Sequence, residues 1–101
     1  MVPVKSLVHG YVEEFTAPSD GLYVVRGINS SQDASQTTGN TCAAFFLKDS
    51  DVNTYSNYIM ASQAPTGKSN RSTAGPLYLR KGQKVYIRAF FSGLGDVCKI
   101  N

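Results

Sequence analysis

The chain has 101 residues, of which 42% are hydrophobic, 11% aromatic and only 17% charged, and its formal net charge is +3. This length leaves room for one domain, and the charged share is low against the usual value of about 25%. The low charge excludes a charge-rich coiled coil or a highly charged disordered tail, and no stretch approaches the roughly 18 consecutive apolar residues of a membrane span. Uncharged polar residues fill the difference (11 Ser, 7 Thr, 6 Asn and 4 Gln), as in a small β-protein with a protein- or sugar-facing surface.

Alternating patterns and turn residues dominate the chain, and no stretch keeps the helical i, i+3, i+4, i+7 spacing. Residues 1–7 are a candidate linker or stalk connection. Strands are expected over residues 8–16, 22–28, 41–47, 54–62, 77–79, 84–91 and 97–100, with turns or polar loops at 17–21, 29–41, 48–52, 63–72, 81–83 and 92–96. The pattern predicts one all-β domain over residues 1–101, a jelly-roll-like sandwich of about 8 short antiparallel strands.

The segment from Leu77 to Phe91 carries the most information, because two alternating strands flank a Lys-Gly-Gln turn. Successive side chains of a strand point to opposite faces, so one set is expected in the core: Leu77, Leu79, Val85 and Ile87. The other set is the candidate interface face: Tyr78, Arg80, Tyr86, Arg88 and Phe90. Tyrosine and arginine supply stacking and planar donors, so three interpretations stay open: a plain exposed sheet, a subunit interface or a ligand surface.

Several apolar side chains fall on strand faces opposite the expected core: Leu22, Val24, Phe46, Tyr86 and Phe90. A monomer of this size would leave several of them on its surface, and contiguous exposed apolar surface usually marks an interface. The sequence therefore predicts self-association.

The charges are unevenly distributed. Residues 1–67 hold three basic and six acidic side chains, whereas residues 68–101 hold seven basic and one acidic. A basic C-terminal third could meet an acidic partner. Because the basic residues are scattered, the favoured interpretation is mutual neutralisation within the domain or between subunits.

Two polar loops are candidate ligand sites, since loops on a rigid sandwich often carry recognition. Their side chains could bind a host cell-surface glycan or protein; the alternative is that the loops are simple connectors. The candidate residues are Asn29, Ser31, Gln32 and Asn40 in the first loop, and Gln63, Lys68, Asn70 and Arg71 in the second.

No catalytic, metal or cofactor site is expected. His9 has no partner that the sequence can place beside it, and the adjacent Glu13 and Glu14 would point to opposite faces of a strand. Cys42 and Cys98 are expected to be half-buried thiols, with a bridge between them as the alternative. Nucleic-acid binding and membrane insertion are not expected. The N-terminus lacks the pattern of a signal peptide.

Two motifs resemble known families. Thr16-Ala17-Pro18-Ser19-Asp20-Gly21 and the aromatic strand after it resemble the opening of distal domains in bacteriophage tail fibres and related virion appendages. Leu77-x-Leu79-x-x-Gly82-x-x-Val85 resembles a pattern of trimeric jelly rolls, the complement globular heads and tumour-necrosis-factor ligands, with Gln83 where Asp is frequent. Gly21-Leu22-Tyr23-Val24-Val25 is similar to a strand of the complement heads, with Val25 in place of Phe.

The resemblance implies a homotrimer around a threefold axis and recognition through loops or grooves between subunits. The expected function is a non-enzymatic virion fibre or appendage module that attaches to a host or surface ligand, made in the host cytoplasm. Two alternatives stay open: a structural virion decoration protein without a host ligand, and a monomeric carbohydrate-binding module with Tyr78 and Tyr86 in an aromatic patch.

Overall fold

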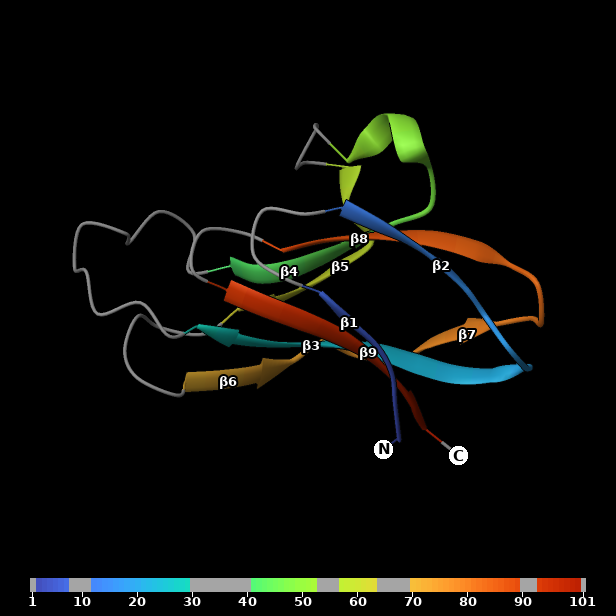
Figure 1. Cartoon of the computed structure of the whole chain (residues 1–101), viewed down its shortest axis with the longest axis horizontal. Helices are drawn as coiled ribbons and strands as arrows, with labels where there is room; N and C mark the ends of the chain where they lie inside the picture. The colour runs from blue at the N-terminus through green and yellow to red at the C-terminus, as the bar shows by residue number, and fades with distance from the viewer. Residues whose placement is uncertain are drawn as a thin grey trace.

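The computed structural model of the chain consists of two antiparallel sheets packed face to face (Figure 1). It describes residues 2–7, 12–29, 41–52, 57–63, 70–89 and 93–100. The first sheet, here sheet A, contains β1 (Val2–Leu7), β9 (Gly93–Ile100), β3 (Gly21–Asn29), β6 (Asn70–Thr73) and β7 (Leu77–Leu79). The second, sheet B, contains β2 (Val12–Thr16), β8 (Lys84–Ala89), β4 (Thr41–Phe46) and β5 (Met60–Gln63).

The strand order identifies the sandwich as a jelly roll. Sheet A runs β1-β9-β3-β6, with β7 also paired to β3, and sheet B runs β2-β8-β4-β5. The first strand thus pairs with the last, the second with the last but one, the third with β6 and β7, and the fourth with the fifth. This nesting is that of one long hairpin rolled into two sheets, which confirms the predicted all-β sandwich.

Four boundaries differ from the sequence expectation. Residues 2–7 form β1 in register with β9, where a linker was expected, and Pro3 is tolerated because β1 is an edge strand with a register shift there. Residues 70–73 form β6 although they are polar, because they pair with the end of β3 through their backbone. Residues 93–96 belong to β9, where glycines suggested a turn. Within the predicted strand 54–62, the described strand begins only at Met60.

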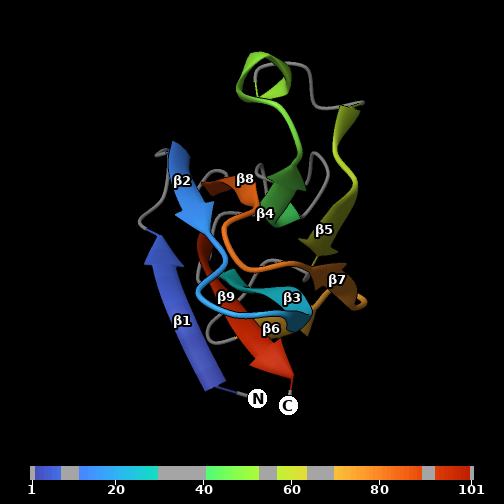
Figure 2. The same ribbon diagram turned by 90° about the vertical axis from the view of Figure 1, so that its right-hand side faces the viewer.

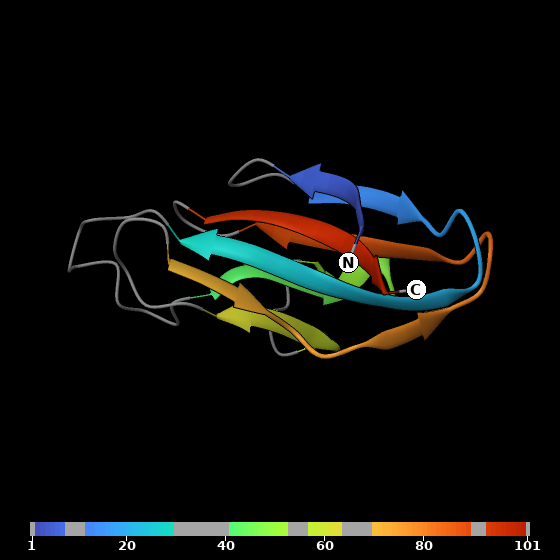
Figure 3. The ribbon, with the colours of Figure 1, turned by 90° about the horizontal axis from the view of Figure 1, so that it is seen from below.

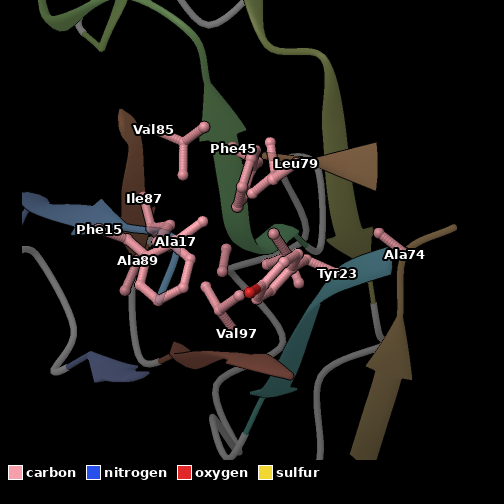
Figure 4. Close-up of a cluster of buried hydrophobic side chains, with 12 residues drawn as sticks. Phe15, Ala17, Tyr23, Phe45, Ala74, Leu79, Val85, Ile87, Ala89 and Val97 are labelled. Atoms are coloured by element: carbon pink, nitrogen blue, oxygen red, sulfur yellow. The ribbon is translucent and has the colours of Figure 1, made fainter. Parts of the chain in front are cut away.

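The core is wide at one end of the sandwich and narrow at the other. At the wide end, Phe15 and Tyr23 meet edge to face with ring centroids 5.7 Å apart, and Phe45 packs in the same cluster (Figure 4). The structure confirms the four predicted core residues. Leu79, Val85 and Ile87 are fully buried, and Leu77 is partly buried against the same cluster.

Glycines line the narrow end. Gly27 and Gly95 are cross-strand partners that face sheet B. A Cβ on Gly95 would lie 2.5 Å from the Ala43 Cβ, and one on Gly27 would overlap Cys42 and Ser62. The sheets therefore approach each other more closely here than side chains at these two positions would allow.

At the wide end, the turn between β2 and β3 is hydrogen-bonded to the turn between β7 and β8. The Ala17 N–H donates to the Gln83 carbonyl (3.0 Å) and the Gly82 N–H donates to the Ala17 carbonyl (2.8 Å). The Lys81 N–H donates to Asp20 Oδ1 at 2.6 Å. Gly82 has a φ of 88°, a conformation that glycine adopts without strain. The Pro-Ser-Asp-Gly and Lys-Gly-Gln turns predicted from sequence are thus joined into one rigid end of the molecule.

The strand ends divide into two sets. Val2 pairs with Lys99, so the two chain ends emerge side by side (Figures 2 and 3). The strand ends that flank residues 8–11, 30–40, 64–69 and 90–92 lie at the opposite end, where Asn29 pairs with both Asn70 and Gly93. We call this the loop end. Among the described residues, no helix is long and apolar enough to cross a membrane.

Candidate functional site

The candidate Tyr/Arg face is split between the two sides of the sandwich. Tyr78 lies on β7 in sheet A, whereas Tyr86 and Arg88 lie on β8 in sheet B. Both strands turn their apolar residues inward, so their other side chains point away from each other on opposite outer faces. The prediction that these side chains share one face is therefore wrong: the turn between β7 and β8 crosses from one sheet to the other. Arg80 is exposed in that turn, and Phe90 lies outside the described residues.

The sheet B half of this set packs against the protein itself. After β4 the chain folds over the outer face of sheet B through a short 3-10 turn, η1 (Asp49–Asp51). Val52 packs there with Phe46 and Ala44, and Tyr86 lies at the margin of the same cluster. Arg88 Nη1 donates to the Val52 carbonyl at 2.8 Å. Part of the apolar surplus predicted on this face is thus covered by residues 47–52.

Replacing Arg88 with methionine is expected to loosen this segment. The substitution keeps most of the apolar stem but removes a charged donor, and hydrogen bonds to charged groups contribute about 1.5–3 kcal/mol. Amide hydrogen exchange at Val52 should accelerate, and urea unfolding should show a loss of about 1–2 kcal/mol. Lys84→Met is the matched control on the same strand, since it removes only an exposed ion pair with Glu14 and should cost under about 0.5 kcal/mol. Equal effects of the two substitutions would contradict the assigned role of Arg88.

The outer face of sheet A carries a different surface. Leu22 is the cross-strand partner of both Tyr78 and Ile100, and Leu22 and Tyr78 are 39% and 55% exposed. Ile28 pairs with Leu94, which is 44% exposed, at the loop end. We call this surface the β3–β9 strip; its outward positions are Leu22, Val24, Arg26 and Ile28 on β3, Leu94, Asp96, Cys98 and Ile100 on β9, and Tyr78 on β7. In Figure 3 these strands run across the front of the molecule.

An ion pair interrupts the strip between its two apolar patches. Arg26 Nε donates to Asp96 Oδ1 (3.0 Å) and Arg26 Nη2 donates to Asp96 Oδ2 (2.8 Å), a two-point contact between cross-strand partners. The Arg26 and Asp96 side chains are 35% and 20% exposed. The hydrogen bonds to Asp96 raise the pKa of the Arg26 guanidinium above its usual value.

Both cysteines are buried thiols. Cys98 lies in the strip beside Asp96 and is fully buried; burial raises the pKa of its thiol, and the Asp96 carboxylate raises it further. A thiol with a raised pKa is a poor nucleophile at neutral pH. Cys42 is fully buried between the sheets beside Gly27. No disulfide joins the two cysteines, which agrees with the expectation of thiols, although both are more deeply buried than expected.

Four of the eight candidate loop residues lie at the ends of described strands. Gln63 ends β5 with an exposed side chain. Asn29 ends β3, and Asn70 and Arg71 begin β6, where only their backbone positions are described. Ser31, Gln32, Asn40 and Lys68 lie outside the described residues. Asn29 and Asn70 are register partners, so the two predicted polar loops leave the sandwich from neighbouring strand ends.

Sequence reasoning found part of the β3–β9 strip and missed its ion pair. Leu22 and Val24 belong to the predicted apolar surplus, and Tyr78 to the Tyr/Arg set; Leu22 is exposed as expected, but Val24 is buried. Arg26 and Asp96 are 70 residues apart in the chain, so no local pattern joins them. Among the described residues, no three His, Cys, Asp or Glu side chains gather as metal ligands would.

Comparison with known proteins assigns no relative to this chain: no family model, no curated protein and no solved structure matches it.

Proposed function

We propose that the chain is a non-enzymatic, homotrimeric module of a virion fibre or appendage, which attaches to a host or surface ligand through its loop end. The observation that supports the proposal is the β3–β9 strip, which has two exposed apolar patches and whose own outward positions sum to no net charge. Arg71 on β6 is the register partner of Ile28 and borders the strip. A strip with net charge would repel an identical copy. This strip neutralises its one arginine with its one aspartate, so three strips can converge on a threefold axis without that cost. Each strip would then contact the next through a different side, as a ring requires.

The two outer faces differ in how their apolar side chains are covered, although Val12 is also exposed on the sheet B face. Residues 47–52 pack over part of the sheet B face, which also carries the Lys84–Glu14 pair. On the sheet A face the outward Val24 and Cys98 are buried, but Leu22, Tyr78 and Leu94 on either side of them stay exposed. Exposed, contiguous apolar surface on a small domain usually marks a contact with another protein.

The sheet edges also favour face-to-face contact. Pro3 and a register shift interrupt β1, and residues 74–76 separate β6 from β7 on the opposite edge of sheet A. In sheet B, Glu13 and Glu14 occupy the edge strand β2, and the described part of β5 has four residues. Proline, irregular register, charge and short length all disfavour the addition of a further strand. Copies would then join through a sheet face.

The positions of the strand ends support an attachment role. The chain ends lie at the wide end, and the strand ends that flank the polar segments lie at the loop end. A fibre joined at the chain ends would leave the loop end free to meet a ligand. The number of three subunits rests on the resemblance to trimeric jelly rolls.

Leu22→Glu and Tyr78→Glu should each dissociate the trimer into folded monomers. Charge placed in a desolvated apolar contact costs several kcal/mol, so association should weaken by at least about 100-fold. Light scattering coupled to size-exclusion chromatography, over a series of micromolar concentrations, measures the mass. Leu47→Glu is the matched control, because Leu47 is 47% exposed but lies outside the strip. A wild-type protein that stays monomeric throughout would refute the proposed assembly.

Attachment needs its own experiment. Labelled trimer should bind intact cells of at least one strain in a broad bacterial panel. No binding to any strain would favour the alternative of a structural decoration protein. The other alternative is a carbohydrate-binding module, for which Tyr78 and Tyr86 were expected to form one aromatic patch. They cannot form one patch, because they lie on opposite sides of the sandwich.

A further inference from the structure

We propose that the Arg26–Asp96 pair selects one arrangement of the assembled copies, and with it their number. This inference rests on the proposed association through the β3–β9 strip. At the outward positions of the strip, Arg26 and Asp96 are the two charged residues among seven uncharged ones. They lie between the Leu22–Ile100 row and the Ile28–Leu94 row, so any broad contact between strips must cover them.

Apolar contacts alone would not specify a single arrangement. Hydrophobic attraction is non-directional, and two apolar rows on a sheet can meet those of a copy in several registers. A charged side chain restricts the arrangement more, because its N–H groups need hydrogen-bond acceptors when they are buried. Asp96 accepts two of the five guanidinium N–H groups of Arg26, and burying the others against an apolar surface costs free energy. Arrangements that offer them an acceptor are therefore favoured.

The partner that fits these donors is the Asp96 carboxylate of a neighbouring copy. Within the same chain its oxygens accept two hydrogen bonds from Arg26 and one from the Cys98 thiol (3.7 Å), and they can accept more. In a ring of copies, each Arg26 would then contact its own Asp96 and that of the next subunit. Buried polar groups are known to fix register and oligomeric state in this way, at some cost in stability.

The first test removes both charges together in Arg26→Leu/Asp96→Leu. This variant should still associate, since apolar replacement of both members of a buried pair is often neutral or stabilising. Native mass spectrometry should show at least two stoichiometries where the wild type shows one. The matched control is Lys5→Leu/Glu13→Leu, which removes an exposed ion pair between β1 and β2 outside the strip and should keep one species.

The second test keeps both charges and reverses them in Arg26→Asp/Asp96→Arg. Each chain retains its internal pair, so this variant should fold and form a single homo-oligomer. When it is mixed with wild type, contacts between unlike copies would oppose Arg to Arg and Asp to Asp. Mixed oligomers should fall to about a tenth of the statistical fraction or less, because like-charge contact costs several kcal/mol.

The outcomes separate this inference from the proposed assembly. A wild-type trimer with an equally uniform Leu/Leu trimer overturns the inference and leaves the assembly standing, as does statistical mixing of the reversed variant. A monomeric Leu/Leu variant would mean that the pair supplies affinity and does not select among arrangements, which also overturns the inference. Mixed stoichiometry in the Lys5/Glu13 control would assign the effect to general loss of surface charge. A monomeric wild type overturns both proposals.

Discussion

Replacing Gly95 with alanine is expected to lower the free energy of unfolding by about 3 kcal/mol, because the new methyl group has no room between the sheets. The added Cβ would lie 2.5 Å from the Ala43 Cβ, an atom held by the backbone of β4 and unable to rotate away. Gly27→Ala should cost a similar amount, since its Cβ would overlap the Cys42 Cβ. Urea unfolding at one fixed protein concentration measures both effects.

Two further variants make this prediction specific. Gly75→Ala is the control, because a Cβ there meets no atom within 4 Å and should change stability by no more than about 0.5 kcal/mol. Ala43→Gly added to Gly95→Ala removes the opposing methyl group and should recover part of the loss. If Gly95→Ala matches wild type in stability, the close approach of the sheets at this end is refuted.

Tyr23→Ala should be the most damaging single truncation, with a loss of about 3–5 kcal/mol. The Tyr23 ring is fully buried and contacts Phe15, and its hydroxyl donates to the Ser19 carbonyl at 2.5 Å. The side chain thus links the core to the turn between β2 and β3. Domains of this size have a total stability of about 5–15 kcal/mol, so the variant could lose most of its folded population.

Tyr23→Phe separates the two roles of this residue. It keeps the ring and removes the hydrogen bond, so we expect a loss of about 1 kcal/mol. Amide exchange should rise in residues 17–20 more than in β8. A Phe variant as unstable as the Ala variant would show that the hydroxyl, and not the packing of the ring, supplies most of the contribution.

Local patterns predicted the parts of the fold that depend on neighbouring residues. Alternation in residues 77–79 and 84–87 placed Leu79, Val85 and Ile87 in the core, because a strand with one buried face repeats every two residues. The Pro-Ser-Asp-Gly and Lys-Gly-Gln turns were found for the same reason, since their residues have local backbone preferences. Strand β6 was missed and β9 was found only in part, because polar or glycine-containing segments become strands only when a partner strand pairs with them.

The candidate site depended more on tertiary structure. The sequence supplied Leu22 as a surplus apolar side chain and Tyr78 as a member of the Tyr/Arg set, but alternation says nothing about which sheet a strand joins. The crossing between β7 and β8 therefore separated Tyr78 from Tyr86, which local reasoning had placed together.

The sequence by itself determined the all-β class, the positions of the main turns and the inward residues of the alternating strands. These properties follow from composition, backbone preference and a two-residue period. Only the tertiary structure decided that Val52 packs over part of the outer face of sheet B, that Gly27 and Gly95 allow the sheets to approach, and that Arg26 meets Asp96. Each of these depends on pairing between segments distant in the chain, and no local pattern carries that information.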